Sequence, residues 1–288
     1  MIETIQQIIV CPNCQSEFNR SEKEYWVCRN CGFKVPLQNG IPIFSDVPKD
    51  IIPSEKVERG PGIGTHWRQA NWKFIEDQIK LLPQQAFILD VGSGRGDFKA
   101  AFAEQNYIGL EILPYPEVDL VCDLNRCVPF KDNTFDMVAL LNICEHVIDP
   151  KSLLRIIYRI LKSGGVAVVA IPFMIKIHQA PYDFGRYTHF ALEKMGRDVG
   201  FDVEKIEGFY DPAGLIDEAL NYYRYWGLSK LSIVKRVMVG CLLSEISFHN
   251  KFIEMIGGRG SIQDPNKYYF PAPTGYHVVY RKMNRGTH

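Results

Sequence analysis

Two Cys-x-x-Cys pairs, Cys11-Pro-Asn-Cys14 and Cys28-Arg-Asn-Cys31, constrain the start of this 288-residue chain more than any other feature. Each pair can bend into a knuckle that presents two thiolates, and two knuckles complete the tetrahedral four-sulfur set that structural zinc prefers. A module of roughly 40 residues buries little apolar surface, so a metal would supply much of its folding free energy. We therefore expect a structural zinc ion held by Cys11, Cys14, Cys28 and Cys31. A redox-active dithiol and a chance pairing are the alternatives.

The other cysteines and the charge balance are those of an ordinary intracellular protein. Four further cysteines are scattered along the chain, a pattern that favours metal ligation over a disulfide framework. The 33 basic and 33 acidic residues cancel, so the chain has no charge excess that would favour nucleic acid or an anionic membrane. The N-terminus lacks a basic, apolar leader, and the most apolar late stretch (231–243) is shorter than the roughly 20 residues that span a bilayer. We expect a cytoplasmic protein without a membrane span.

Composition divides the chain into three regions. Residues 1–45 form the Cys-paired module, and residues 46–64 carry Pro and Gly among charges, as a linker does. Strand-like and helix-like segments alternate over 65–288, which predicts an α/β domain. An aromatic-rich helical insert is expected at about 212–258, either as a lid or as part of the core. Its aromatic cluster is Tyr222, Tyr223, Tyr225 and Trp226.

Local patterns place the elements of the large domain. Thr65 is expected to cap a helix that runs to Leu82. Seven strands are expected at 86–91, 107–112, 118–122, 135–141, 166–171, 201–209 and 276–282. Further helices are expected from the Gly-rich segment to about 105, at 150–161 before Ser163-Gly164-Gly165, and at 189–199 before Gly200.

A Gly-rich turn, LDVGSGRGDF at 89–98, ends a predicted strand and opens a predicted helix. Glycines there let the backbone turn tightly and approach a ligand. Such a turn alone is weak evidence, since NAD enzymes carry one too. Here the spacing is GxGxG after Asp90, and acidic residues, Glu111 and Asp123, end the next two strands.

This set resembles class I S-adenosylmethionine methyltransferases of type 11, over about residues 65–209 and the final strand. The resemblance implies a seven-stranded Rossmann-like sheet with helices on both faces. It implies that the turn lies against the methionine and ribose, that Glu111 takes the ribose hydroxyls and that Asp123, beside Leu124, accepts from the adenine amino group. The cofactor-binding residues expected on this basis are Asp90, Gly92, Ser93, Gly94, Gly96, Glu111, Asp123, Leu124 and Asn142.

Two later blocks strengthen this resemblance. The block around the family's fourth strand is similar to VPFKDNTFDMVALLNICEHVIDP in this chain. The next helix and strand of the family are similar to RIIYRILKSGGVAVVAIPF. One departure lies between Glu111 and Asp123, where the family usually has a full helix and this chain has LPYPEV.

The module after the second cysteine pair also resembles a known family. VCRNCGFKVPLQNGIPIF is similar to the small zinc-ribbon activator of tRNA and protein methyltransferases, including its Gly-Ile-Pro hairpin at Gly40-Ile41-Pro42. The alternative is a generic zinc ribbon with no partner-activating role.

Two segments with reactive side chains follow strands at the edge where α/β sheets bind ligands. Methyl transfer to oxygen needs alignment and loss of a proton, and imidazole is suited to accept that proton. His178 is the first candidate base, with Asp183 to orient it or to hold the acceptor; a loop-capping His178 and an Asp183–Arg186 pair are the structural alternative. His146 is expected to line the methyl end of the cofactor, whereas Glu145 is expected to brace the fold.

Three hypotheses of function follow. The first is a methyltransferase for a small molecule, sugar or glycan-linked acceptor, with transfer to oxygen. The second is an rRNA or tRNA methyltransferase that uses the zinc ribbon for recognition, although the neutral charge disfavours RNA. The third is a non-catalytic binding protein that retains the fold. No NPPY-like tetrapeptide follows the fourth strand, which argues against methylation of DNA amines.

Overall fold

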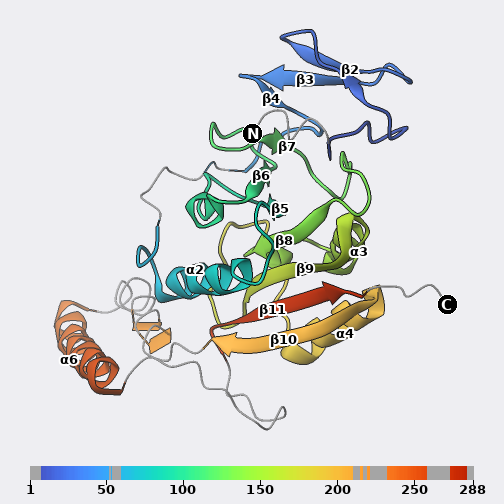
Figure 1. Ribbon diagram of the computed structural model, residues 1–288. Helices are drawn as coiled ribbons and strands as arrows, with labels where there is room; N and C mark the ends of the chain where they lie inside the picture. The colour runs from blue at the N-terminus through green and yellow to red at the C-terminus, as the bar shows by residue number, and fades with distance from the viewer. Residues whose placement is uncertain are drawn as a thin grey trace.

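The computed structural model describes residues 8–51, 53, 60–209, 215–216, 219–220, 232–257 and 273–283, which form two sheets (Figure 1). The small sheet has the order β1-β2-β3-β4, and the seven-stranded sheet has the order β10-β11-β9-β8-β5-β6-β7. The predicted Rossmann-like sheet with a small N-terminal module is thus confirmed. The exact domain boundaries stay a prediction.

The small sheet consists of antiparallel strands β1 (Phe18–Asn19), β2 (Tyr25–Cys28), β3 (Lys34–Gln38) and β4 (Ile41–Pro42). The elements of the large unit are α2 (His66–Ile79), β5 (Phe87–Val91), the 3-10 turn η1 (Lys99–Phe102), β6 (Asn106–Glu111), β7 (Leu120–Val121), β8 (Phe135–Leu141), the 3-10 turn η2 (Cys144–His146), α3 (Pro150–Ile160), β9 (Leu161–Pro172), α4 (His189–Val199), β10 (Phe201–Phe209), α6 (Ile233–Gly257) and β11 (Gly275–Lys282).

The large sheet is mixed. Strands β5 to β9 run parallel, and β11 lies antiparallel between β9 and β10. Its central strands are apolar on both faces because helices cover both. Along β8, Met137 and Ala139 face the side covered by α2, and Val138 and Leu140 face the side covered by α3 and α4. This alternation follows from the two-residue period of a strand.

Capping residues set the helix ends. The Thr65 hydroxyl accepts a hydrogen bond from the Arg68 amide, as expected for an N-cap. Asp149 caps α3 in the same way through the Ser152 amide, and Thr188 caps α4 through the Ala191 amide. Gly200 ends α4 with a φ of 107°, a conformation that glycine adopts without strain.

Two expectations about helices and strands were wrong. The helix predicted after the Gly-rich turn is only η1, since Gly92, Gly94 and Gly96 all have positive φ and extend the turn into the space the helix would need. β9 begins at Leu161 rather than at residue 166. The segment Ser163-Gly164-Gly165 forms an irregularity in this strand, which lets Leu161 pair with Phe135 while Val166 pairs with Met137.

The Cys-paired module packs on the β7 edge of the large sheet (Figure 1). The Phe44 amide donates to the Val121 carbonyl at 2.8 Å, and Ile43 bridges Val121 in parallel. Ile9 bridges Phe130. Apolar residues of this module therefore share one core with the sheet and α3.

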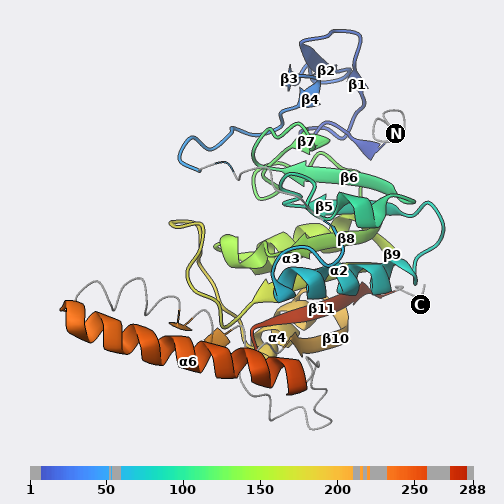
Figure 2. The same cartoon turned by 90° about the vertical axis from the view of Figure 1, so that its left-hand side faces the viewer.

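The described part of the insert is dominated by α6, which extends along one side of the molecule (Figure 2). Its side chains Val234, Val237 and Met238 are exposed, and Leu243 is buried. The aromatic cluster at 222–226, on which the lid and core alternatives depended, lies outside the described residues. None of the helices in the described ranges has the length and apolar character needed to cross a membrane.

Candidate active site

The Gly-rich turn connects β5 to η1 at the carboxyl edge of the sheet. The amides of Gly92 and Ser93 both donate to the Leu110 carbonyl, at 2.8 and 3.0 Å, which binds the turn to β6. Gly92 has a φ of 72°, and a Cβ atom there would lie 1.9 Å from Cδ1 of Ile143. Position 92 therefore requires glycine, for its backbone conformation and for the close approach of the segment after β8.

Glu111 ends β6 and faces this turn. Its carboxylate accepts from the Gly94 amide at 2.9 Å and from the Ile112 amide at 2.7 Å, one bond on each oxygen. Burial raises the pKa of Glu111, while the amides of Ile112, Gly94 and Leu113 oppose the shift. A carboxylate offers about four lone pairs, so Glu111 can accept from a further donor on a ligand.

Asp90 lies beneath the turn. The Tyr107 hydroxyl donates to Asp90 Oδ2 at 3.0 Å, and both residues are buried. Burial raises the pKa of Asp90 to about 7, with the Tyr107 hydrogen bond opposing the shift. Its contacts support β5 and β6 under the turn.

Asp123 follows β7. Its amide donates to the Ser45 hydroxyl at 2.8 Å, and its carboxylate accepts from the Asn125 amide at 3.0 Å and lies 3.4 Å from Arg126. Leu124 is buried. Asp123 therefore stands at the same sheet edge as Glu111, held by a residue of the N-terminal module.

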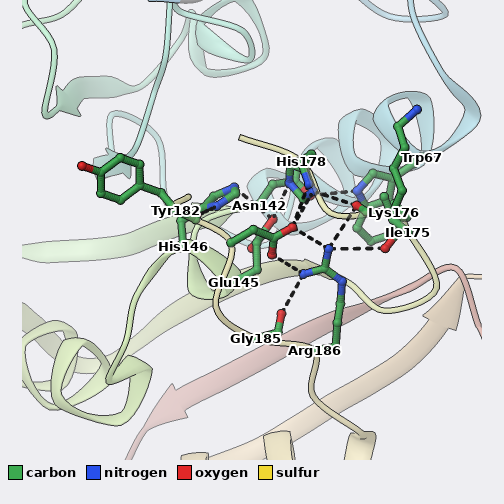
Figure 3. Close-up of polar contacts among 11 residues, drawn as sticks. Trp67, Asn142, Glu145, His146, Ile175, Lys176, His178, Tyr182, Gly185 and Arg186 are labelled. Atoms are coloured by element: carbon green, nitrogen blue, oxygen red, sulfur yellow. Dashed lines mark hydrogen bonds and ion pairs between the residues drawn. The ribbon is translucent and has the colours of Figure 1, made fainter. Parts of the chain in front are cut away.

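Asn142 follows β8 with a φ of 57°. Its amide donates to the Ala170 carbonyl at 2.8 Å, and its side-chain oxygen accepts from the Trp67 indole at 2.8 Å (Figure 3). Trp67 comes from α2, where the sequence indicated only an apolar helix position. The contact spans 75 residues, and no local pattern predicts it.

Glu145, His146 and His178 converge next to Asn142 (Figure 3). Glu145 Oε1 lies 3.7 Å from Nε2 of His146 and 3.7 Å from Nε2 of His178. The Glu145 side chain is fully buried, and neither carboxylate oxygen has a hydrogen-bond partner among the described residues. The sequence predicted the two histidines as site residues but gave Glu145 only a bracing role.

Asp183 orients His178 from the other side. Asp183 Oδ2 accepts from the His178 amide at 2.9 Å and lies 3.2 Å from its Nδ1. Arg186 donates to both carboxylate oxygens, at 2.5 and 2.8 Å, and these hydrogen bonds lower the pKa of Asp183 to about 2. The pKa of His178 is raised, chiefly by Glu145. The structure thus contains both the Asp183–Arg186 pair and the His178–Asp183 contact.

The four cysteines of the paired motif form one cluster. Sγ of Cys11 lies 3.5 Å from that of Cys31, and Sγ of Cys14 lies 3.4 Å from that of Cys28. All four sulfurs lie within 4.8 Å of one another. With Zn–S bonds of about 2.3 Å, tetrahedral ligands lie roughly 3.8 Å apart, so the donor set fits a zinc ion.

A cavity of about 720 Å³ lies at the junction of the N-terminal module and the large sheet, next to the first cysteine pair and to Ser45, which contacts Asp123. Three cations line it, Lys34, Arg126 and Arg159. Arg126 pairs with Asp123 and Arg159 pairs with Asp132, so much of this positive charge is neutralised.

Known proteins show similarity to this chain. Residues 89–169 match the methyltransferase-domain family. Demethylmenaquinone methyltransferase of Renibacterium salmoninarum is 27% identical over 139 residues, 43% of this chain and 52% of the relative. Ubiquinone biosynthesis O-methyltransferase of Pseudomonas putida is 27% identical over 180 residues, 50% of this chain and 75% of the relative. A Mycobacterium leprae methyltransferase is 35% identical over 101 residues, 31% of this chain and 38% of the relative. The chain spans about half the length of the first of these relatives.

Solved structures include a SAM-dependent methyltransferase from Archaeoglobus fulgidus, 19% identical with a TM-score of 0.46, covering 75% of this chain and 94% of that one. A complex of the Haloferax volcanii Trm112 methyltransferase activator with a methyltransferase is 19% identical with a TM-score of 0.48. The match covers 77% of this chain and 92% of that one. Likenesses of this size support nothing further. The family match, the sequence relatives and the strand order together identify a class I S-adenosylmethionine-dependent methyltransferase domain in this chain.

Proposed function

We propose that this protein transfers a methyl group from S-adenosylmethionine to an oxygen atom of a small-molecule acceptor. The observation that supports binding of the cofactor is Glu111, whose carboxylate ends β6 against the Gly-rich turn, next to the Gly94 amide, within the matched methyltransferase domain. A carboxylate at this position suits the hydroxyls of the cofactor's ribose. Asp123, with Leu124, would take the adenine. The cofactor supplies an activated methyl group on sulfur, and the protein's residues bind and orient it.

The other cofactor residues support this arrangement. Gly92, Ser93, Gly94 and Gly96 form the turn against which the methionine part would lie. Asp90 stabilises the strands below it, and Asn142 fixes the segment after β8 through Trp67. Because the methyl donor carries positive charge on sulfur, the acidic character of this edge favours its binding.

The acceptor half rests on Glu145, His146, His178 and Asp183. Transfer to oxygen needs a hydroxyl that loses its proton, and His178, oriented by Asp183, is positioned to accept it. The relatives named for demethylmenaquinone and for O-methylation in ubiquinone biosynthesis support a small aromatic or hydroxylated acceptor. A sugar or glycan-linked hydroxyl has the same chemistry.

Calorimetry with S-adenosylhomocysteine tests the cofactor half. We expect one binding site per chain in the wild type and weaker binding in Asp90→Ala. Absence of binding heat in folded wild type would refute the proposal. Transfer of a labelled methyl group to a panel of phenols, quinols and sugars tests the acceptor half, and retention of the protein on immobilised RNA at physiological salt would favour an RNA substrate instead.

We also propose that Cys11, Cys14, Cys28 and Cys31 hold one structural zinc ion. The convergence of their sulfurs supports this, as does the small size of the sheet they anchor. Metal analysis of the purified full-length protein is expected to give one zinc per chain that resists dialysis. Eight titratable thiols in the native protein, without zinc, would contradict the proposal.

A further inference from the structure

We propose that Glu145, His146 and His178 form a binding site for one divalent metal cation, beside which the acceptor hydroxyl is placed. This inference deepens the proposed function and rests on it for the identity of the reaction. It begins from hydrogen bonding around three side chains that come from two loops, one after β8 and one after β9 (Figure 3).

Both imidazoles have their Nδ1 atoms engaged. Nδ1 of His146 lies 2.5 Å from the Tyr182 carbonyl oxygen, and a carbonyl only accepts, so this nitrogen carries the proton. Nδ1 of His178 lies 3.2 Å from Asp183 and 3.3 Å from the Lys176 carbonyl, which are acceptors as well. In its neutral form, each ring therefore presents the lone pair of Nε2 to Glu145. A histidine that binds a metal through one ring nitrogen usually donates the N–H of its other ring nitrogen to a carboxylate or a carbonyl oxygen, as Nδ1 does here.

Glu145 gives the site its negative charge. Its carboxylate is fully buried and accepts no hydrogen bond from the described residues, which is costly for an isolated charge. Nε2 of His146 also has no hydrogen-bond partner in the described part of the chain. Arg186 interacts with Glu145 through its charge and not through a hydrogen bond, because its guanidinium donates to Asp183 and to three carbonyl oxygens. When both rings are neutral, three acceptors thus converge without a donor between them.

The distances suit a shared cation better than a direct pair. At 3.7 Å, both contacts between Nε2 and Glu145 exceed the roughly 2.7–3.2 Å of a hydrogen bond. Two ligands of one cation, each bound at about 2.1 Å, lie roughly 3.0–3.4 Å apart, so small shifts bring each imidazole and Glu145 to that spacing, and all three ligand atoms already lie within 4.8 Å of one another. Two imidazoles and one carboxylate suit Zn²⁺, Mn²⁺, Fe²⁺ or Co²⁺ and leave coordination positions open, whereas Mg²⁺ prefers oxygen ligands.

This site refines the role of His178, which becomes a ligand rather than the base. A cation lowers the pKa of a hydroxyl beside it. In the transfer, the hydroxyl proton goes to solvent and the oxygen lone pair forms the new O–CH₃ bond. The S–CH₃ bond breaks with its electron pair left on sulfur, which yields a neutral thioether.

Manganese is the probe for the test, because its electron paramagnetic resonance signal reports free Mn²⁺ and thiolates of the zinc ribbon bind it poorly. Full-length protein, dialysed against metal-free buffer and shown by metal analysis to retain the zinc of its ribbon, is titrated with MnCl₂. We expect one bound Mn²⁺ per chain and a rise of the melting temperature with added Mn²⁺. Wild type that binds no Mn²⁺ up to millimolar concentration would overturn the inference.

Variants locate the site. Glu145→Gln keeps the shape but removes the charge, and His178→Ala removes a nitrogen; each is expected to weaken Mn²⁺ binding at least about tenfold, as is Asp183→Asn through the orientation of His178. His249→Asn removes an exposed histidine of α6 and is expected to bind Mn²⁺ like wild type. If Glu145→Gln and His178→Ala, both folded by circular dichroism, bind Mn²⁺ as tightly as wild type, the assignment is wrong.

Calorimetry with S-adenosylhomocysteine on the same samples separates the two proposals. Cofactor binding without Mn²⁺ binding refutes the cation site and leaves the methyltransferase intact. Mn²⁺ binding without cofactor binding refutes the proposed function instead. Methyl transfer that proceeds without added divalent cation in protein that retains its zinc, but is lost in His178→Ala, would make His178 the base and overturn the cation's role.

Discussion

Glu111→Gln is the sharpest test of the cofactor site, because the two oxygens of Glu111 are already accounted for. Each accepts a hydrogen bond from a backbone amide, that of Gly94 or that of Ile112, and the carboxylate has acceptor capacity left for a ligand. A glutamine side chain has one acceptor oxygen and one NH₂ donor. The variant therefore loses an acceptor for the ligand and sets a donor against a backbone amide.

The expected effect follows from the energies of such bonds. A hydrogen bond to a charged group contributes about 1.5–3 kcal/mol, so losing one weakens S-adenosylhomocysteine binding about 10- to 150-fold. The unpaired amide adds some loss of stability. Isothermal titration calorimetry measures the affinity, and thermal unfolding measures the stability of the same samples.

Glu104→Gln is the matched control, since Glu104 is an exposed carboxylate on the loop before β6. It should bind S-adenosylhomocysteine like wild type. A Glu111→Gln protein that is folded and binds within threefold of the control would refute the assignment of Glu111 to the ribose hydroxyls.

Three further predictions follow from the same contacts. Gly92→Ala should weaken S-adenosylhomocysteine binding measured by calorimetry, because the left-handed backbone costs about 1–2 kcal/mol and the new Cβ meets Ile143; wild-type affinity would contradict this. Cys11→Ser should lose the zinc found by metal analysis and melt at a lower temperature than Cys241→Ser, a change at an exposed cysteine. The His277 ring stacks between the rings of Trp67 and Phe74, and burial lowers its pKa to about 3. Near pH 6.5, therefore, only the unfolded chain takes up a proton at this residue. The buried Asp90, whose pKa is raised to about 7, shifts stability in the opposite direction over the same pH range, so the contribution of His277 is the difference between wild type and His277→Phe. From about pH 7 to about pH 5 the wild type should lose about 2 kcal/mol of stability in urea relative to His277→Phe; equal slopes would refute it.

The parts of the fold that the sequence predicted are those with local causes. Thr65 could be recognised as a cap, and the apolar run of β8 could be recognised as a strand covered on both faces. The prediction of a helix after the Gly-rich turn was wrong because three glycines there have positive φ, which is incompatible with a helix. The sequence shows where the glycines are but not which backbone conformation they adopt. The early start of β9 depends on its pairing with Phe135, a contact that only the assembled sheet creates.

The site divides in the same way. The Gly-rich turn, Glu111 and Asp123 stand at fixed intervals along one pattern of strands, so their common edge follows from topology. The His178 contacts with Asp183 are local in sequence and were predicted as a possible pair. Glu145 was undervalued because its importance depends on having no hydrogen-bond partner and on two imidazoles meeting it, one from 33 positions later in the chain. No periodicity encodes that arrangement.

The position of the N-terminal module gives it a role beyond holding a metal. β7 is a two-residue edge strand, and an exposed edge of this kind is a weak point of a sheet. Phe44 covers it through the Val121 carbonyl, and Ser45 accepts the amide of Asp123, the residue proposed to hold adenine. A zinc ion that orders the module would therefore also order the carboxylate at the end of β7. The ribbon's structural metal and the cofactor site are in this way connected through the contacts of Phe44 and Ser45, so a protein without zinc should lose cofactor affinity before its large sheet unfolds.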